Sequence, residues 1–160
     1  MMSCMLRYTQ MGSLYDPNSQ YFARSGLGFY VNHDHRANIA KPLDTPHPSV
    51  FRAELCAILH AVQVCAMPTI VRPDCKSARQ LARSAIHDGK YDKKHADADI
   101  LSLIAEIANK NCVIKWIPAH IDEERYKKKR EKILAMGGTE LQIESNCQAD
   151  ALEQARSRID

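Results

Sequence analysis

The feature that most constrains the fold is one apolar stripe with helical spacing. Its four residues stand at positions i, i+3, i+4 and i+7, which puts them on the same face of an α-helix. They are Leu55, Ile58, Leu59 and Val62, and they predict a helix over residues 50–65. Because a helix with one apolar face must bury that face, the rest of the chain has to supply a sheet or further helices for it to pack against.

Three segments before this helix have the composition of strands. They are residues 5–9, 26–31 and 38–43, and the second contains two glycines that allow close backbone approach. Turn-forming residues at 16–19 follow the first segment, and a proline-containing loop at 44–48 follows the third. Three short strands in succession predict an antiparallel meander.

Strand and helix patterns alternate after this helix. We expect strands at residues 69–71 and 112–117, a helix at 76–86 and a polar connection at 87–95. A further helix is indicated by a stripe made of Ile100, Leu103, Ile104 and Ile107. Asp97 and Asp99 lie near its start, where carboxylates interact favourably with the helix dipole. A last helix is marked by Ala149, Leu152 and Ala155. This order predicts an α/β domain with helices covering a mixed sheet.

Length and composition fit one domain. The chain has 160 residues and 45% hydrophobic content, so we expect a single domain over residues 1–160 with one core.

The sequence carries no signal for a membrane or for secretion. No stretch approaches the roughly 20 apolar residues of a membrane span, and the opening MMSCMLRYTQ lacks the apolar run of a secretory signal. We therefore expect an intracellular protein, in the nucleus or cytoplasm, with no membrane partner. The six cysteines form no C-x-x-C pair, and we expect them to be reduced thiols.

A dense basic run is the main charge feature. The net charge is only +3, which does not by itself indicate a nucleic-acid binder. The run lies in a segment at about residues 121–145, which we expect to be the least ordered part of the chain. Two interpretations stay open: a solvated helix face or loop, and a patch that contacts phosphates or directs nuclear import. The basic residues are Arg125, Lys127, Lys128, Lys129, Arg130 and Lys132.

Five short motifs follow one another along these elements. They are Tyr8-Thr9-Gln10-Met11-Gly12-Ser13, Arg52-Ala53-Glu54-Leu55, Pro73-Asp74-Cys75, Trp116-Ile117-Pro118-Ala119-His120 and Asn146-Cys147-Gln148-Ala149-Asp150. In this order they resemble the motifs Y-T-D-G-S, R-A-E-L, T-D-S, W-x-x-G-H and N-E-x-A-D of the ribonuclease H family, type I. The resemblance covers nearly the whole chain, from Tyr8 to about Ala155.

The resemblance implies both a fold and a site. The fold would be ribonuclease-H-like, with a mixed five-stranded sheet whose first three strands are antiparallel, flanked by helices. The site would cleave the RNA strand of RNA–DNA hybrids with two Mg²⁺ ions about 3.5–4 Å apart, held by carboxylate oxygens. Glu54, Asp74 and Asp150 would be the metal ligands, and His120 would assist proton transfer or product departure. The basic segment 121–145 would be an insertion relative to the family.

Each of these four residues also has a structural interpretation when it is taken alone. Glu54 would be a first-turn helix residue, and Asp74 would cap the helix that begins near Lys76. Asp150 would be a solvent-facing carboxylate, and His120 would be a loop histidine. Their occurrence together, in the family's order, favours the site.

The family's first aspartate is missing. Gln10 has no charge to neutralise two divalent cations, and Met11 offers a soft thioether that is a poor ligand for Mg²⁺. Asp16, six residues after Gln10, would replace the lost ligand if the first loop folded back towards the metals. Its neighbours have the composition of an ordinary turn.

Residues on the substrate side also depart from the family. Val50 and Phe51 stand where the family places asparagines that contact the RNA strand, and their side chains cannot hydrogen-bond a 2′-hydroxyl. The loop after His120 is longer than in the family and begins with Ile121-Asp122 in place of a glycine-bearing turn.

These departures favour a pseudoenzyme that binds nucleic acid, whether RNA, DNA or RNA–DNA hybrid, or a protein partner. Such a protein needs no cofactor. The alternative is an active endonuclease that uses Mg²⁺ or Mn²⁺, with Asp16 recruited to the site. A third hypothesis places the function at an oligomer interface, with Val50 and Phe51 as exposed apolar contacts.

Overall fold

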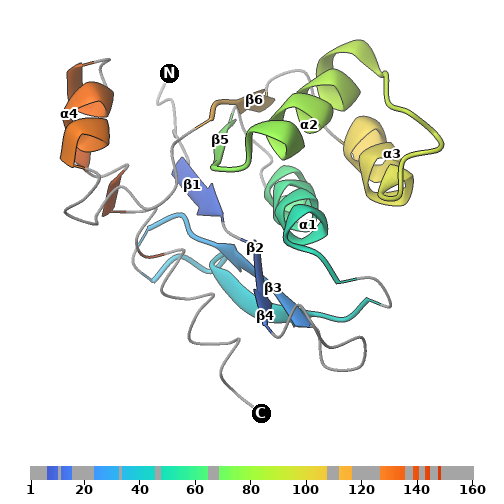
Figure 1. Cartoon of the computed structure of the whole chain (residues 1–160), viewed down its shortest axis with the longest axis horizontal. Coiled ribbons are helices and arrows are strands. Elements are labelled where there is room, and N and C mark those ends of the chain that lie inside the picture. The colour runs from blue at the N-terminus through green and yellow to red at the C-terminus, as the bar shows by residue number, and fades with distance from the viewer. Residues whose placement is uncertain are drawn as a thin grey trace.

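Strands and helices alternate along the chain in the computed structural model. The structure describes residues 7–10, 12–15, 24–32, 34–45, 48–64, 69–107, 112–116, 127–135, 139–140, 143–144 and 148. Its strands within these residues are β1 Arg7–Gln10, β2 Gly12–Tyr15, β3 Arg24–Phe29, β4 Ile39–Leu43, β5 Thr69–Pro73 and β6 Cys112–Ile114. Its helices are α1 Val50–Val64, α2 Lys76–Asp88, α3 Ala98–Ile107 and α4 Lys127–Ala135 (Figure 1).

The strands form two three-stranded sheets. Strands β2, β3 and β4 form an antiparallel sheet, and β1, β5 and β6 form a parallel one. The predicted α/β fold is confirmed, and the second and third predicted strands do pair antiparallel, as β3 and β4, but the single five-stranded sheet is not confirmed. The segment predicted as the first strand, residues 5–9, overlaps with β1, which pairs in parallel with β5. The strand that pairs antiparallel with β3 is instead β2, at residues that were not predicted as a strand. Met11, between β1 and β2, lies outside the described residues.

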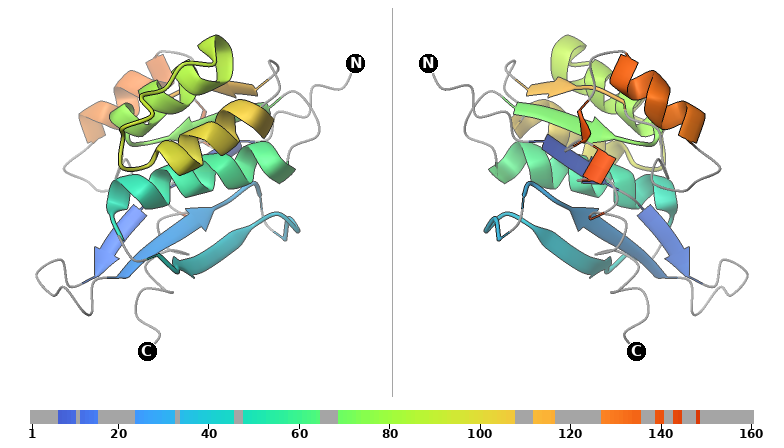
Figure 2. Two further views of the ribbon diagram at one scale, coloured as in Figure 1. Left: turned by 90° about the vertical axis from the view of Figure 1, so that its right-hand side faces the viewer. Right: turned by 90° about the vertical axis from the view of Figure 1, so that its left-hand side faces the viewer.

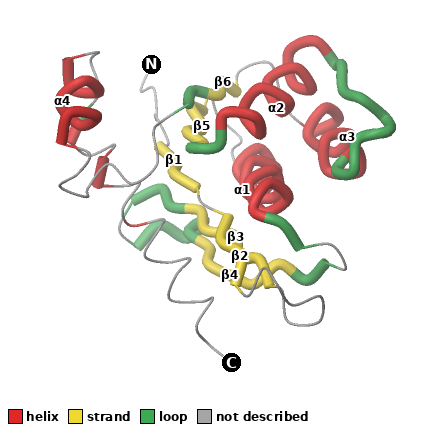
Figure 3. Tube along the Cα trace, viewed as in Figure 1, coloured by secondary structure: helices red, strands yellow, loops and turns green. Residues whose placement is uncertain are grey.

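Helix α1 connects the two sheets and carries much of the core. It begins at Val50 because Ser49 caps it: the Ser49 Oγ accepts a hydrogen bond of 2.9 Å from the Arg52 backbone N–H. This N–H lies in the first turn, where no carbonyl group of the helix itself is available as an acceptor. Three residues of its predicted stripe are buried, namely Leu55, Ile58 and Val62. They join one cluster with residues of β3, β5, α2 and α3. Helices α1, α2 and α3 lie together on one side of the strands (Figures 2 and 3).

Helix α3 lies where it was predicted, but the residues it buries differ in part from the predicted apolar stripe. Ile100 and Ile104 are buried, as the spacing indicates. The third fully buried residue is Leu101, whereas Leu103 and Ile107 are exposed. Apolar residues lie on more than one face of α3, so their spacing alone could not show which face packs against α1 and α2.

Part of the basic segment is helical. Residues 127–135, expected to lie in the least ordered part of the chain, form helix α4, which lies apart from α1, α2 and α3 (Figure 1). Its Ile133 and Leu134 pack against the buried Ile143, which provides a small core of its own. The predicted last helix lies outside the described residues. Among the described helices, none combines the length and the apolar character needed to cross a membrane.

Candidate active site and nucleic-acid surface

The parallel pairing of β1 and β5 sets the geometry of the candidate site. In the register of these strands Gln10 lies opposite Pro73, and Asp74 is the next residue after Pro73. Because the carboxyl ends of parallel strands meet at the same edge of a sheet, Gln10 and Asp74 come from neighbouring strand ends. The position predicted for the missing aspartate is therefore beside the position predicted for a metal ligand, and it holds an amide.

Glu54 lies on α1, which packs against both β1 and β5. Its side chain is only 1% exposed, and it lies in the second turn of the helix, since the first turn holds no acidic residue. The interpretation of Glu54 as a first-turn helix residue is therefore wrong. Glutamate side chains are seldom buried to this extent unless they have a partner.

Asp74 does not occupy the N-cap position of α2, so its interpretation as a capping residue is also wrong. Cys75 occupies that position, and its side chain makes no capping hydrogen bond. The Asp74 carbonyl oxygen instead accepts a hydrogen bond of 2.7 Å from the indole N–H of Trp116, just after β6. Lys76 begins α2, and its ammonium lies 4.5 Å from the centroid of the Trp116 ring. The turn that carries Asp74 is thus tied to the end of β6.

The described residues do not by themselves fit a pair of metal ions. Of the three predicted metal ligands, Glu54 and Asp74 are described, and they bring two negative charges against the four positive charges of two Mg²⁺ ions. In the described part of the chain, no three His, Cys, Asp or Glu side chains gather closely enough to hold a metal. Asp16, His120 and Asp150 lie outside the described residues.

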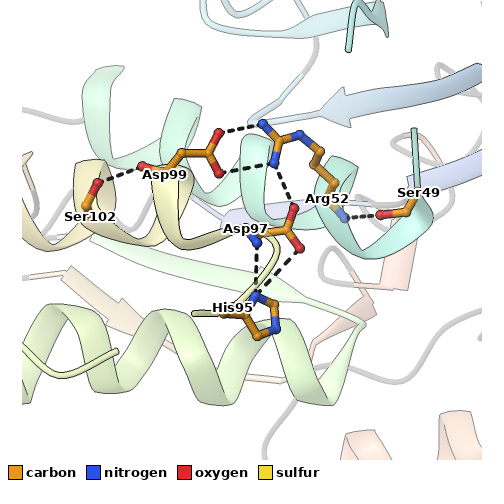
Figure 4. A network of polar contacts seen from close by, with 6 residues as sticks. All are labelled: Ser49, Arg52, His95, Asp97, Asp99 and Ser102. Atoms are coloured by element: carbon orange, nitrogen blue, oxygen red, sulfur yellow. Dashed lines mark hydrogen bonds and ion pairs between the residues drawn. The ribbon is translucent and has the colours of Figure 1, made fainter. Parts of the chain in front are cut away.

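An ion-pair network between α1 and the start of α3 was not predicted. The Arg52 guanidinium donates to the Asp97 carboxylate at 2.8 Å and to the two oxygens of Asp99 at 2.6 and 3.1 Å (Figure 4). Asp99 and Asp97 raise the pKa of Arg52 against the opposing effect of burial, and Arg52 lowers the pKa of Asp99. The Asp97 backbone N–H donates a hydrogen bond of 3.1 Å to His95 Nδ1. The network joins the start of α1 to the start of α3.

The predicted basic residues are largely on α4. Lys127, Lys128, Arg130 and Lys132 are exposed, Lys129 lies in the same helix, and Arg125 lies outside the described residues. Arg130 forms an ion pair of 2.7 Å with Glu140, and both side chains are largely exposed. The interpretation as a solvated helix face is confirmed for these exposed residues, and that exposure also leaves them accessible to a phosphate.

Val50 and Phe51, which stand where the family has asparagines, differ in their exposure to solvent. Val50 is exposed, but Phe51 is half-buried and packs on the core, with its ring centroid 5.6 Å from that of His95. Phe51 therefore does not form the exposed apolar contact expected of it. Cys56 and Cys75 are free thiols.

The antiparallel and parallel sheets, the three packed helices and the paired strand ends define a ribonuclease-H-like α/β domain. A family model described as RNase H matches residues 8–133, and the chain belongs to this family. None of the curated proteins matches its sequence.

Two solved structures illustrate the similarity. The solution structure of the RNase H domain of prototype foamy virus has a TM-score of 0.60 and 17% sequence identity, and the match covers 92% of this chain and 91% of that domain. The crystal structure of prototype foamy virus protease–reverse transcriptase has a TM-score of 0.60 and 15% identity. That match covers 96% of this chain and 21% of the viral protein, so this chain corresponds to about a fifth of it. At these identities the similarity concerns the fold.

Proposed function

We propose that this domain binds nucleic acid, as RNA or RNA–DNA hybrid, through the surface of a ribonuclease H site that has lost most of its hydrolytic power. The observation that carries the proposal is the register of β1 and β5, which puts Gln10 opposite Pro73 and beside Asp74. Membership of the RNase H family supports nucleic acid as the class of partner.

The loss of one charge at this position has a large expected effect on catalysis. Enzymes of this family typically use divalent metals, and a carboxylate shared by two cations offsets their mutual repulsion in the transition state. An amide at Gln10 supplies oxygen without charge. A loss of about 4 kcal/mol of transition-state stabilisation corresponds to about three decades of rate.

The binding surface would combine the strand edge with basic side chains. Lys127, Lys128 and Lys132 are exposed on α4 and are suited to phosphate contacts, which give affinity without sequence specificity. A protein partner is the competing hypothesis for the same surface. Salt dependence separates the two, because counterion release makes nucleic-acid binding fall steeply as salt is added.

The catalytic half of the proposal is tested by cleavage of an RNA–DNA hybrid with Mg²⁺ and, separately, with Mn²⁺. We expect the unsubstituted protein to cleave the hybrid at a rate close to that of the Asp74→Asn variant. The Gln10→Asp variant should cleave it much faster than either. The Glu54→Gln change in the Gln10→Asp background is the matched control, since it should abolish any restored cleavage. Strong cleavage by the natural sequence that Asp74→Asn removes would establish an active endonuclease instead.

The binding half is tested with a fluorescently labelled hybrid followed by anisotropy. We expect binding at low salt that weakens steeply as salt rises, and a smaller salt slope after charge removal at Lys128 and Lys132 together. No binding at any salt concentration would refute the proposal.

A further inference from the structure

A basic stripe runs along α2 from the edge of the candidate site. Lys76, Arg79 and Arg83 are spaced i, i+3 and i+7, so they share one face of the helix. Lys76 and Arg83 are exposed and Arg79 is half-buried. The face that packs into the core consists of Ala78, Ala82, Ala85 and Ile86. The stripe is thus a solvent-facing row of positive charge rather than part of the core.

Charge on α2 is nearly all of one sign. Its only acidic residue is Asp88, at the last position of the helix. Among the described residues, no carboxylate forms an ion pair with Lys76 or Arg83. These cations are therefore available to a ligand that carries several negative charges along its length.

An exposed tryptophan stands where the stripe begins. Trp116, the only tryptophan in the chain, is 38% exposed. The Lys76 ammonium lies 4.5 Å from the centroid of its ring. Its indole N–H is fixed by the Asp74 carbonyl oxygen at 2.7 Å. The ring is therefore held at the edge of the candidate site with part of its surface open to solvent.

We propose that Trp116 and the α2 stripe bind an unpaired nucleic-acid strand that continues from the candidate site. The indole would stack on one base, and Lys76, Arg79 and Arg83 would contact successive phosphates. An unpaired strand is favoured over a duplex because bases inside a duplex are already stacked on each other and cannot reach an indole. The inference rests on the proposed nucleic-acid function and names the form of nucleic acid that this edge recognises.

The contact between Lys76 and Trp116 is compatible with this role. A cation–π contact at an exposed site is weaker than the stacking of a base on an aromatic ring. An incoming base can therefore replace the ammonium on the ring, and Lys76, which is a flexible side chain at the helix start, can turn to the neighbouring phosphate.

The fluorescence of Trp116 gives a direct test because no other tryptophan contributes to it. Two labelled probes would be used: a blunt RNA–DNA hybrid, and the same hybrid with a single-stranded DNA extension. We expect the extended hybrid to quench Trp116 and to bind more tightly than the blunt one. Label anisotropy measures binding independently of the tryptophan.

Three groups of variants assign the effect to the ring and to the stripe. Trp116→Leu is expected to weaken binding of the extended hybrid by about tenfold and binding of the blunt hybrid much less, while Trp116→Phe keeps most of the affinity because the ring remains. Lys76→Ala and Arg83→Ala should each reduce the salt slope by about one. Lys93→Ala, an exposed lysine in the connection from α2 to α3, is the matched control and should change neither quantity.

The outcomes separate this inference from the proposed function. Binding of both hybrids with no change in Trp116 fluorescence, and with the affinity of Trp116→Leu unaltered, would overturn the inference while leaving the proposed function intact. Equal losses in Trp116→Phe and Trp116→Leu would also overturn it, since the indole would then act through its bond to Asp74. Absence of binding to either probe at low salt would refute both.

Discussion

Arg52 binds two aspartates that differ mainly in their exposure to solvent, and this difference allows a quantitative prediction. The Asp97 side chain is 10% exposed and lies 2.8 Å from the guanidinium. Asp99 lies closer, at 2.6 Å, but its side chain is 60% exposed. If bond length decided the energy, Asp99 would matter more, whereas if burial decided it, Asp97 would matter more.

We expect burial to decide it. An ion pair with an exposed carboxylate is screened by water and contributes about 0–1 kcal/mol, so Asp99→Asn should cost less than about 1 kcal/mol of unfolding free energy. A hydrogen bond to a charged group away from solvent contributes about 1.5–3 kcal/mol, so Asp97→Asn should cost about 2 kcal/mol. For a domain of this size, these values correspond to falls in Tm of about 2 °C and about 6 °C.

Replacing the shared partner gives a third value. Arg52→Met keeps a side chain of similar length but leaves the Asp97 carboxylate without its cation, and removing one partner of a buried pair costs about 3–5 kcal/mol. The lower end applies because the Arg52 side chain is 19% exposed and His95 stays close to Asp97. We therefore expect a loss of about 3 kcal/mol.

The measurement is thermal and urea unfolding of the three variants, followed by circular dichroism at neutral pH in low and high salt. Added salt should reduce the small effect of Asp99→Asn and leave that of Asp97→Asn nearly unchanged. A loss for Asp99→Asn that equals or exceeds the loss for Asp97→Asn would refute the argument from burial.

Two further predictions concern single positions. Burial lowers the pKa of His60 below its ordinary value of 6.5, so its contribution to stability is present above that pH and is lost as the pH falls through the lower folded-state value. The fall in Tm from about pH 7.5 to about pH 5.5 should therefore shrink in His60→Gln, and an unchanged fall would contradict the assignment. Gly89 ends α2 with φ of +61° and open space around it, so Gly89→Ala should cost about 1 kcal/mol from backbone strain alone. An unchanged Tm would show that the turn relaxes.

The sequence predicted those parts of the fold that depend on neighbours in the chain. The stripe of Leu55, Ile58 and Val62 located α1 because helical spacing is a local property. Choosing between Leu101 and Leu103 on α3 required the positions of α1 and α2, which local spacing does not contain. The parallel pairing of β1 with β5 likewise depends on a strand that lies far along the chain.

The same distinction applies to the candidate site. Motif order predicted Gln10, Glu54 and Asp74, and the register of β1 with β5 gives two of them a common strand edge. The bond from Arg52 to Asp97 spans 45 positions, and the bond from Trp116 to Asp74 spans 42. No single-sequence pattern links residues so far apart, although an arginine beside a helix start and a tryptophan after a strand were both visible in the motifs.

These long-range bonds change what the retained motifs imply about hydrolysis. Arg52 joins α1 to α3, and the Trp116 indole holds the turn at Asp74, so both motifs have structural work that does not require a metal. Glu54 is buried in the same helix that Arg52 fixes. Their presence is therefore compatible with a domain that has given up cleavage. For that reason Gln10→Asp, which leaves both of these motifs unchanged in sequence, tests the catalytic question separately from their structural roles.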